Sequence, residues 1–205
     1  CMEDQIIPTV ITQTYLLNDS SSLPIVSMAT DGRYFFDEKI GMYVEGTNGL
    51  PGNCSDDSVN WNQDWERPAN IEYFTAEGVP AINQMVGLRI HGGCSRMWDY
   101  KSLAVIARNK YGDNSLSYPF FPSKKVDDFK SLILRNSGND AYYSMLRDGF
   151  MQSLLTGQMD LDCQGYQPAH VYLNGEYWGL YNLRERINAD YLAQHYQLDT
   201  DDINL

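Results

Sequence analysis

The chain has 205 residues and is 43% hydrophobic, which is enough for one ordinary domain with a real core and excludes an intrinsically disordered protein. Its 27 acidic and 15 basic residues give a formal net charge of −12, which argues against sequence-independent binding of nucleic acid phosphates or anionic lipid. No run of about 18 apolar residues is present, so the sequence predicts no membrane span.

Residues 1–22 are predicted to be an introductory segment, with an edge strand at residues 10–17 followed by a polar break. Residues 23–205 are predicted to form the main domain. The mostly apolar stretch 23–30 predicts its first strand, with Pro24 near the start, where a missing backbone amide is tolerated.

Four further strands and a loop are predicted next. Residues 41–45 predict a short strand, and the stretch 46–62, rich in Gly, Pro, Asn and Asp, predicts a long loop. Alternating apolar residues separated by turn signals then predict strands at residues 69–75, 84–90 and 102–108. An antiparallel meander is the simplest arrangement of these three strands.

A buried strand at residues 132–134 is predicted to precede a helix. Apolar residues at positions 142, 145, 146, 150 and 154 recur at helical spacing, which predicts a helix of about four turns over residues 140–155. We interpret Asp140 as its N-cap and Asp148 as the partner of a nearby arginine, rather than as catalytic acids. A second helix is predicted at residues 189–197.

The stretch 170–186 predicts a hairpin, because Asn174-Gly175 is the pair that most readily supplies the two positive φ angles of a type I′ turn. Its second strand ends near Glu185. The Glu185 carboxylate is expected either to be solvated at the strand end or to pair with a cation. Strands, then a helix, then a hairpin predict an α+β fold of mostly antiparallel sheet with a few helices.

The spacing of the cysteines argues against a zinc site and against a dense disulfide network. Cys1, Cys54, Cys94 and Cys163 are widely spaced without a CxxC pair, so neither a zinc site nor a dense disulfide network is indicated, and we expect free or singly paired thiols. Fifteen tyrosines and loops rich in Asn, Gly and Asp are typical of secreted or cell-surface proteins, so an extracytoplasmic location is expected.

A glycine turn between two predicted strands is the first candidate site. Gly92 and Gly93 would let the backbone approach a ligand closely, and Arg89, His91 and Arg96 surround them in the sequence, so the turn could hold a phosphate. The alternative is a structural Gly-Gly hairpin turn with solvated arginines.

Lys101 is the second candidate, because it leads the next predicted strand and a fixed ammonium can neutralise the α- and β-phosphates of a nucleotide. Such a lysine needs an acid to hold it, and Glu185 is the candidate acid. The alternative is an exposed lysine at a strand end.

Several short motifs occur together in an order that resembles the spore coat protein H (CotH) kinase family, over roughly residues 9–205. They are Leu23-Pro24-Ile25-Val26-Ser27, Trp65-Glu66-Arg67-Pro68-Ala69, Arg89-Ile90-His91-Gly92-Gly93, Leu134-Arg135-Asn136, Asn139-Asp140, Leu146-Arg147-Asp148 and residues 173–181. The resemblance implies an atypical protein-kinase-like fold that transfers phosphate from ATP, with Mg or Mn, to Ser or Thr of secreted, surface or coat proteins.

Carried over to this chain, the resemblance implies that Arg89, His91, Gly92, Gly93, Arg96 and Lys101 bind the cofactor and that Lys101 and Glu185 are the catalytic pair. The chain departs from the family at Cys94, where Ser is common. The family's metal-binding aspartates come later, so these residues are expected to be the N-terminal part of the domain and inactive alone. The alternative function is a non-catalytic extracellular module that binds protein or glycan.

Overall fold

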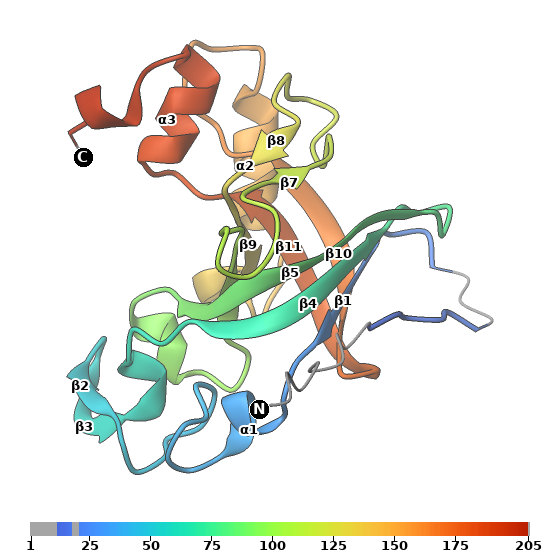
Figure 1. Ribbon diagram of the computed structural model, residues 1–205. Coiled ribbons are helices and arrows are strands. Elements are labelled where there is room, and N and C mark those ends of the chain that lie inside the picture. Colours follow the sequence, from blue (N-terminus) through green and yellow to red (C-terminus); the bar gives the residue numbers. More distant parts are fainter. Residues whose placement is uncertain (1–11, 18–20, 205) are drawn as a thin grey trace, which may run out of the picture.

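The computed structural model describes residues 12–17 and 21–204, and its centre is a closed seven-stranded barrel (Figure 1). The barrel strands are β1 (Ile25–Ala29), β4 (Arg67–Phe74), β5 (Pro80–His91), β6 (Ser102–Ile106), β9 (Ser131–Arg135), β10 (Tyr166–Leu173) and β11 (Glu176–Glu185). Around the barrel they run in the order β1-β10-β11-β9-β6-β5-β4. The prediction of an α+β protein with a mostly antiparallel sheet is confirmed at this level.

Short elements cover the two ends of the barrel (Figure 1). At one end lie α1 (Arg33–Phe36) and the hairpin β2 (Leu50–Gly52) and β3 (Ser55–Val59), and at the other lie β7 (Leu116–Ser117), β8 (Asp128–Phe129), α2 (Arg147–Leu155) and α3 (Ala189–Tyr196). Single 3₁₀ turns are η1 (Asn60–Asn62), η2 (Cys94–Met97), η3 (Gly138–Asp140) and η4 (Thr200–Asp202). Every helix among the described residues is too short or too polar to cross a membrane.

The barrel closes through β1. The predicted meander is present as β4, β5 and β6, which pair in sequence and antiparallel. β1 pairs antiparallel with β4 and parallel with β10, so that Val26 lies opposite both Tyr73 and Val171. The closing pair is distant in the sequence and was not predicted.

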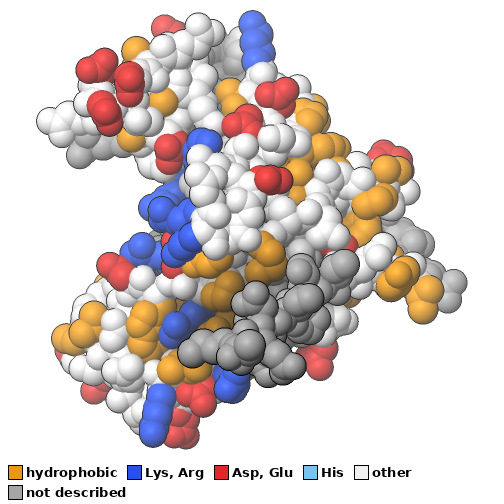
Figure 2. Space-filling view, viewed as in Figure 1, with side chains coloured by type: hydrophobic (Ala, Val, Ile, Leu, Met, Phe, Trp, Pro, Cys, Tyr) orange, Lys and Arg blue, Asp and Glu red, His pale blue; other side chains and the backbone are white. Residues whose placement is uncertain are grey.

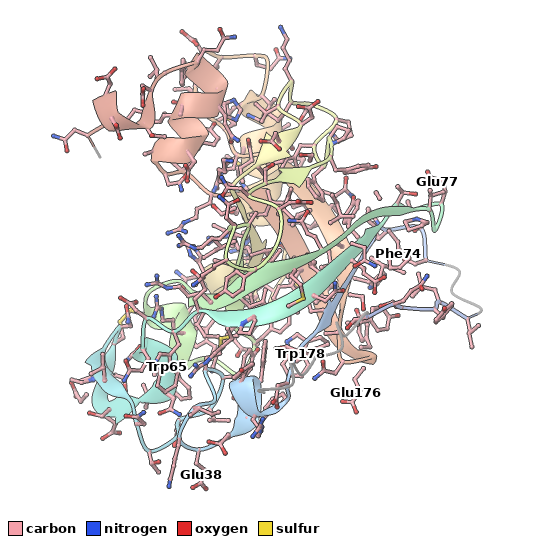
Figure 3. The ribbon with its side chains drawn as sticks, viewed as in Figure 1. Glu38, Trp65, Phe74, Glu77, Glu176 and Trp178 are labelled. Carbon is pink, nitrogen blue, oxygen red and sulfur yellow. A yellow bond between two sulfur atoms is a disulfide. The ribbon has the colours of Figure 1, made fainter. Side chains whose placement is uncertain are left out.

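Side chains on the barrel strands alternate between an apolar interior and an outer face. Leu88, Ile90, Leu103 and Leu134 are at most 2% exposed and belong to the hydrophobic core. Their sequence neighbours therefore point outward, because successive side chains on a strand lie on opposite faces of a sheet. Trp178 of β11 packs at the α1 end of the barrel against Phe35, Phe36 and Tyr43 (Figure 3).

The predicted hairpin is confirmed. β10 and β11 pair antiparallel around Asn174 and Gly175, whose φ angles are 51° and 86°. Both angles are positive, as a type I′ turn requires. Asn174 also fixes the turn to the first strand, since its Oδ1 accepts a hydrogen bond from Thr30 N at 2.9 Å.

Three predictions in the first third of the chain are wrong or only partly covered. Residues 12–17 form no strand, and the rest of the strand predicted at 10–17 lies outside the described residues. Residues 41–45 form bends instead of a strand, and the predicted loop 46–62 contains β2, β3 and η1. The buried side chain of Asn60 helps to hold this part of the chain in a fixed conformation, because it donates hydrogen bonds to the carbonyls of Glu38 and Gly41 at 2.9 and 3.0 Å.

The helix predicted at residues 140–155 begins only at Arg147, as α2. Met145 adopts a left-handed φ of 57°, which a helix cannot contain. The prediction that Asp140 is the N-cap is wrong, because Leu146 occupies that position, but the Asp140 carboxylate still accepts from Leu146 N and Arg147 N at 3.0 and 3.1 Å. Four of the apolar side chains whose spacing predicted the helix are exposed, which are Tyr142, Leu146, Phe150 and Leu154. α3, in contrast, matches the predicted helix 189–197 to within one residue.

Candidate functional site

Cationic side chains share the outer face of four adjacent barrel strands. Arg89 on β5 pairs with Ala104, Ala104 with Ile133, and Ile133 with Arg184 on β11. Directly paired residues of antiparallel strands lie on the same face, and so do residues two positions apart on one strand. The outer face therefore also carries His91 and Arg135, and Arg186 follows where β11 ends.

His91 lies at the centre of these charges. Burial lowers the pKa of His91 to about 4, and repulsion from Arg186, Arg135, Arg96 and Arg89 adds to that lowering. His91 is therefore neutral at physiological pH. Figure 2 shows Lys and Arg side chains gathered in the hollow between the α3 end and the β2–β3 end of the molecule. We call His91 with these four arginines the His91 cluster.

The four arginines of the His91 cluster are held to different degrees. Arg89 pairs with the exposed Asp64, and Arg135 Nε pairs with Asp148 Oδ2 at 3.1 Å. Arg96 has no carboxylate partner among the described residues and donates to the carbonyls of Gly92 and Trp61 at 2.5 and 3.2 Å. No side-chain hydrogen bond or ion pair joins Arg186 to a described residue. The cluster therefore keeps a positive charge that protein carboxylates do not neutralise.

The glycine turn is fixed at the edge of the cluster. Gly92 has a φ of 113°, and a Cβ added there would lie 2.6 Å from Ser95 Oγ, so the position requires glycine. Cys94 forms a disulfide with Cys54, whose Cα lies 5.0 Å away between β2 and β3. Cys163 is free and buried, so the expectation of free or singly paired thiols is confirmed for the three described cysteines.

Lys101 lies in a different environment. Its side chain is buried, with Nζ 4.1 Å from the centre of the Trp61 ring and 5.1 Å from that of Tyr43, and Nζ donates to Trp98 O at 2.6 Å. Burial lowers the pKa of Lys101 to about 8. The alternative of an exposed strand-end lysine is therefore wrong. The open pocket beside it, of about 610 Å³, is bordered by three acids, which are Glu38, Glu45 and Asp99.

The structure does not bring Lys101 and Glu185 together. Glu185 is paired with Leu132, which is paired with Val105, whereas Lys101 precedes the first residue of β6. Along the strand direction, Lys101 therefore lies four residues away from the level of Glu185, which is roughly 13 Å at about 3.3 Å per residue. Glu185 instead bonds His195 and Lys124, with Glu185 Oε1 2.6 Å from His195 Nε2. The catalytic and cofactor roles given to Lys101 and Glu185 stay predictions.

Sequence reasoning missed Arg135 and Arg186, although strand parity could have indicated them. Arg135 lies two residues beyond outward-facing Ile133, and Arg186 two residues beyond Arg184. Arg184 itself is fully buried, with Nη1 2.8 Å from Asp148 Oδ2. Asp148 thus holds two arginines, which confirms its interpretation as an arginine partner.

The His91 cluster is suited to an anion that carries several oxygens, because guanidinium groups bind phosphate and carboxylate through paired N–H donors. Arg96 and Arg186, which form no ion pair with a described carboxylate, are the members of the cluster that could bind such an anion. Within the described residues, no three His, Cys, Asp or Glu side chains lie close enough to hold a metal ion.

A protein-family model matches the second part of the chain. The family model described as CotH kinase protein matches residues 88–205, which are more than half of the chain. The match begins one residue before Arg89 and therefore includes the His91 cluster and all the predicted site residues. No curated protein matches the chain.

Proposed function

The chain belongs to the CotH kinase protein family, and from this premise we propose that it binds ATP and serves ATP-dependent phosphorylation of Ser or Thr in secreted, surface or coat proteins. In this proposal the barrel and its end elements are part of an atypical kinase-like fold. Mg²⁺ or Mn²⁺ accompanies the nucleotide as its phosphate complex.

The observation that carries the proposal is the His91 cluster. In a chain with a net charge of −12, four arginines converge on one histidine, and two of them lack a carboxylate partner among the described residues. Phosphoryl transfer depends mainly on positioning the phosphates and neutralising their charge. Arg96 and Arg186 would bind phosphate oxygens, and the backbone of Gly92 and Gly93 would approach them closely.

The Cys54–Cys94 disulfide supports an extracytoplasmic location as part of the proposal, because disulfides persist in oxidising compartments and are rare in the cytosol. It also holds η2, which begins at Cys94, against the β2–β3 hairpin. The turn that would face the phosphates is thereby positioned before any ligand arrives.

Calorimetric titration of the chain with Mg–ATP tests the proposal. Arg186→Ala should weaken binding about tenfold, the usual loss for one charge-assisted hydrogen bond. Arg33→Ala is the matched control, because Arg33 is an exposed arginine on α1 that pairs only locally with Asp31. Equal affinity in the Arg186 and Arg33 variants would remove the cluster from the site, and a parent chain that binds no Mg–ATP would refute the function.

One observation favours the alternative of a binding module. Around α2, Tyr142, Tyr143, Phe150, Met151 and Leu154 are all more than half exposed. Exposed apolar surface of this kind often marks protein contacts. A chain that binds no nucleotide, yet loses binding to an extracellular protein when Phe150 is changed to Ser, would support that function instead.

A further inference from the structure

A buried carboxylate organises a second polar centre at the end of β11. Glu185 Oε1 lies 2.6 Å from His195 Nε2 of α3. Glu185 Oε2 accepts from Gly165 N at 2.6 Å and lies 3.8 Å from Lys124 Nζ. The Glu185 side chain is 3% exposed, so both of its oxygens are committed to these partners.

Lys124 is the cation that this carboxylate holds. Its side chain is 13% exposed, and Nζ also donates to the Cys163 carbonyl. An ammonium has three donors, and the hydrogen bond to Cys163 uses one of them, so donors remain for a ligand. Lys124 lines an open pocket of about 590 Å³ together with His195 and Gln194.

The charges that surround Lys124 and Lys101 differ. Two lysines, Lys124 and Lys125, and two aspartates, Asp127 and Asp128, line the Lys124 pocket. At Lys101, in contrast, three carboxylates border the pocket against a single ammonium. Since like charges repel, the Lys101 pocket opposes a polyphosphate more strongly than the Lys124 pocket does.

The Lys124 pocket is also connected to the His91 cluster. Arg186 belongs to that cluster and directly follows Glu185. Arg186 and Glu185 line one small cavity together with Gln194. Gln194 in turn lines the Lys124 pocket. Gln194 therefore borders both the cavity at Arg186 and the Lys124 pocket, which places the Arg186 end of the His91 cluster beside that pocket.

We propose that Lys124, oriented by Glu185 and His195, is the lysine that contacts the nucleotide phosphates, in place of Lys101. The inference rests on the proposed function, since it assigns a residue to the same nucleotide site. A lysine fixed by a buried glutamate is the arrangement by which protein kinases hold nucleotide phosphates. Glu185 acts as a positioning residue, because its buried carboxylate reaches the ligand only through Lys124, and His195 helps to hold that carboxylate in place.

The test is calorimetric titration of Mg–ATP into three single variants of the chain. Lys124→Met should weaken binding about tenfold to a hundredfold, the range for a lost hydrogen bond to a charged group. Lys39→Met is the matched control, since this exposed lysine lies outside the Lys124 pocket, and its affinity should stay within about twofold of the parent. Lys101→Met should bind like the parent.

Loss of fold must be separated from loss of the ligand contact, because Lys124→Met leaves Glu185 with one partner fewer. The double variant Lys124→Met/Glu185→Gln removes the unpaired charge, and it should regain thermal stability while Mg–ATP binding stays weak. Recovery of binding in the double variant would overturn the inference. So would weak binding by Lys101→Met with parental binding by Lys124→Met, although the proposed function would then stand. A parent that binds no Mg–ATP refutes both.

Discussion

Removing the Cys54–Cys94 disulfide should destabilise the fold by a measurable amount. The bridge joins residues 40 positions apart in the sequence. A loop of that length gives a loss of chain entropy in the unfolded state worth about 4 kcal/mol at 25 °C. Because β3 and η1 lie inside the loop and can retain structure when the chain unfolds, we expect about 2–4 kcal/mol for Cys54→Ser/Cys94→Ser.

Thermal denaturation measures this loss. For a domain of this size each kcal/mol shifts Tm by about 2–4 °C, so the double variant should melt roughly 4–16 °C below the oxidised parent. Reductant should lower the parent's Tm by a similar amount. Added to the double variant, reductant should have no effect, because the remaining described cysteine, Cys163, is buried and free.

Equal Tm values for the oxidised parent and the double variant would refute the reasoning. They would mean that the turn at Gly93 and the β2–β3 hairpin hold together without the bond. Mg–ATP titration of the double variant gives a second measurement. Without the disulfide the turn is no longer tied to the hairpin, so it must be ordered when the ligand binds. Affinity should therefore fall with stability, and an unchanged affinity would show that the turn is positioned by its other contacts.

Two further predictions concern stability. Gly149→Ala should destabilise the fold by about 1–3 kcal/mol in urea denaturation, although alanine is the better helix former, because its Cβ would lie 2.3 Å from the Tyr166 ring; a rise in stability would contradict that packing. The pKa of His91 is lowered to about 4, so between pH 6.5 and 4 the unfolded chain binds a proton that folded His91 does not. Stability should therefore fall as the pH falls through that interval, and His91→Asn should lessen the dependence; identical pH profiles of parent and variant would exclude the effect.

Local signals in the sequence were sufficient for the hairpin and for most strands. Asn174 and Gly175 specify their turn by backbone preference alone, and the end of β5 alternates apolar and polar residues at Leu88, Arg89, Ile90 and His91, as a half-buried strand does. α3 has a capping residue, Asn188, whose side chain accepts from Tyr191 N at 3.1 Å. Such features depend on a few neighbouring residues, so they can be predicted.

The failures have tertiary causes. Helical periodicity from residue 142 onward was misleading because Met145 takes a left-handed conformation and the apolar side chains of α2 face outward. The partner of Glu185 could not be predicted, because both Lys124 and His195 reach it from separate segments. The register of β11 determines whether the Glu185 side chain can contact Lys124 and His195. That register depends on strand pairing across the whole sheet, which local sequence does not specify.

The parallel pairing of β1 with β10 has a consequence for how the chain folds. Ile25 must meet His170, 145 positions later, and closing a flexible loop of that length costs about 4 kcal/mol of chain entropy before the contact stabilises anything. The β4–β5–β6 meander needs only short loops and can form earlier. Until β10 is synthesised, β1 has an open edge, and such edges pair with other chains. During synthesis this protein therefore passes through a long interval in which aggregation competes with folding, and slower expression at lower temperature should increase its soluble yield.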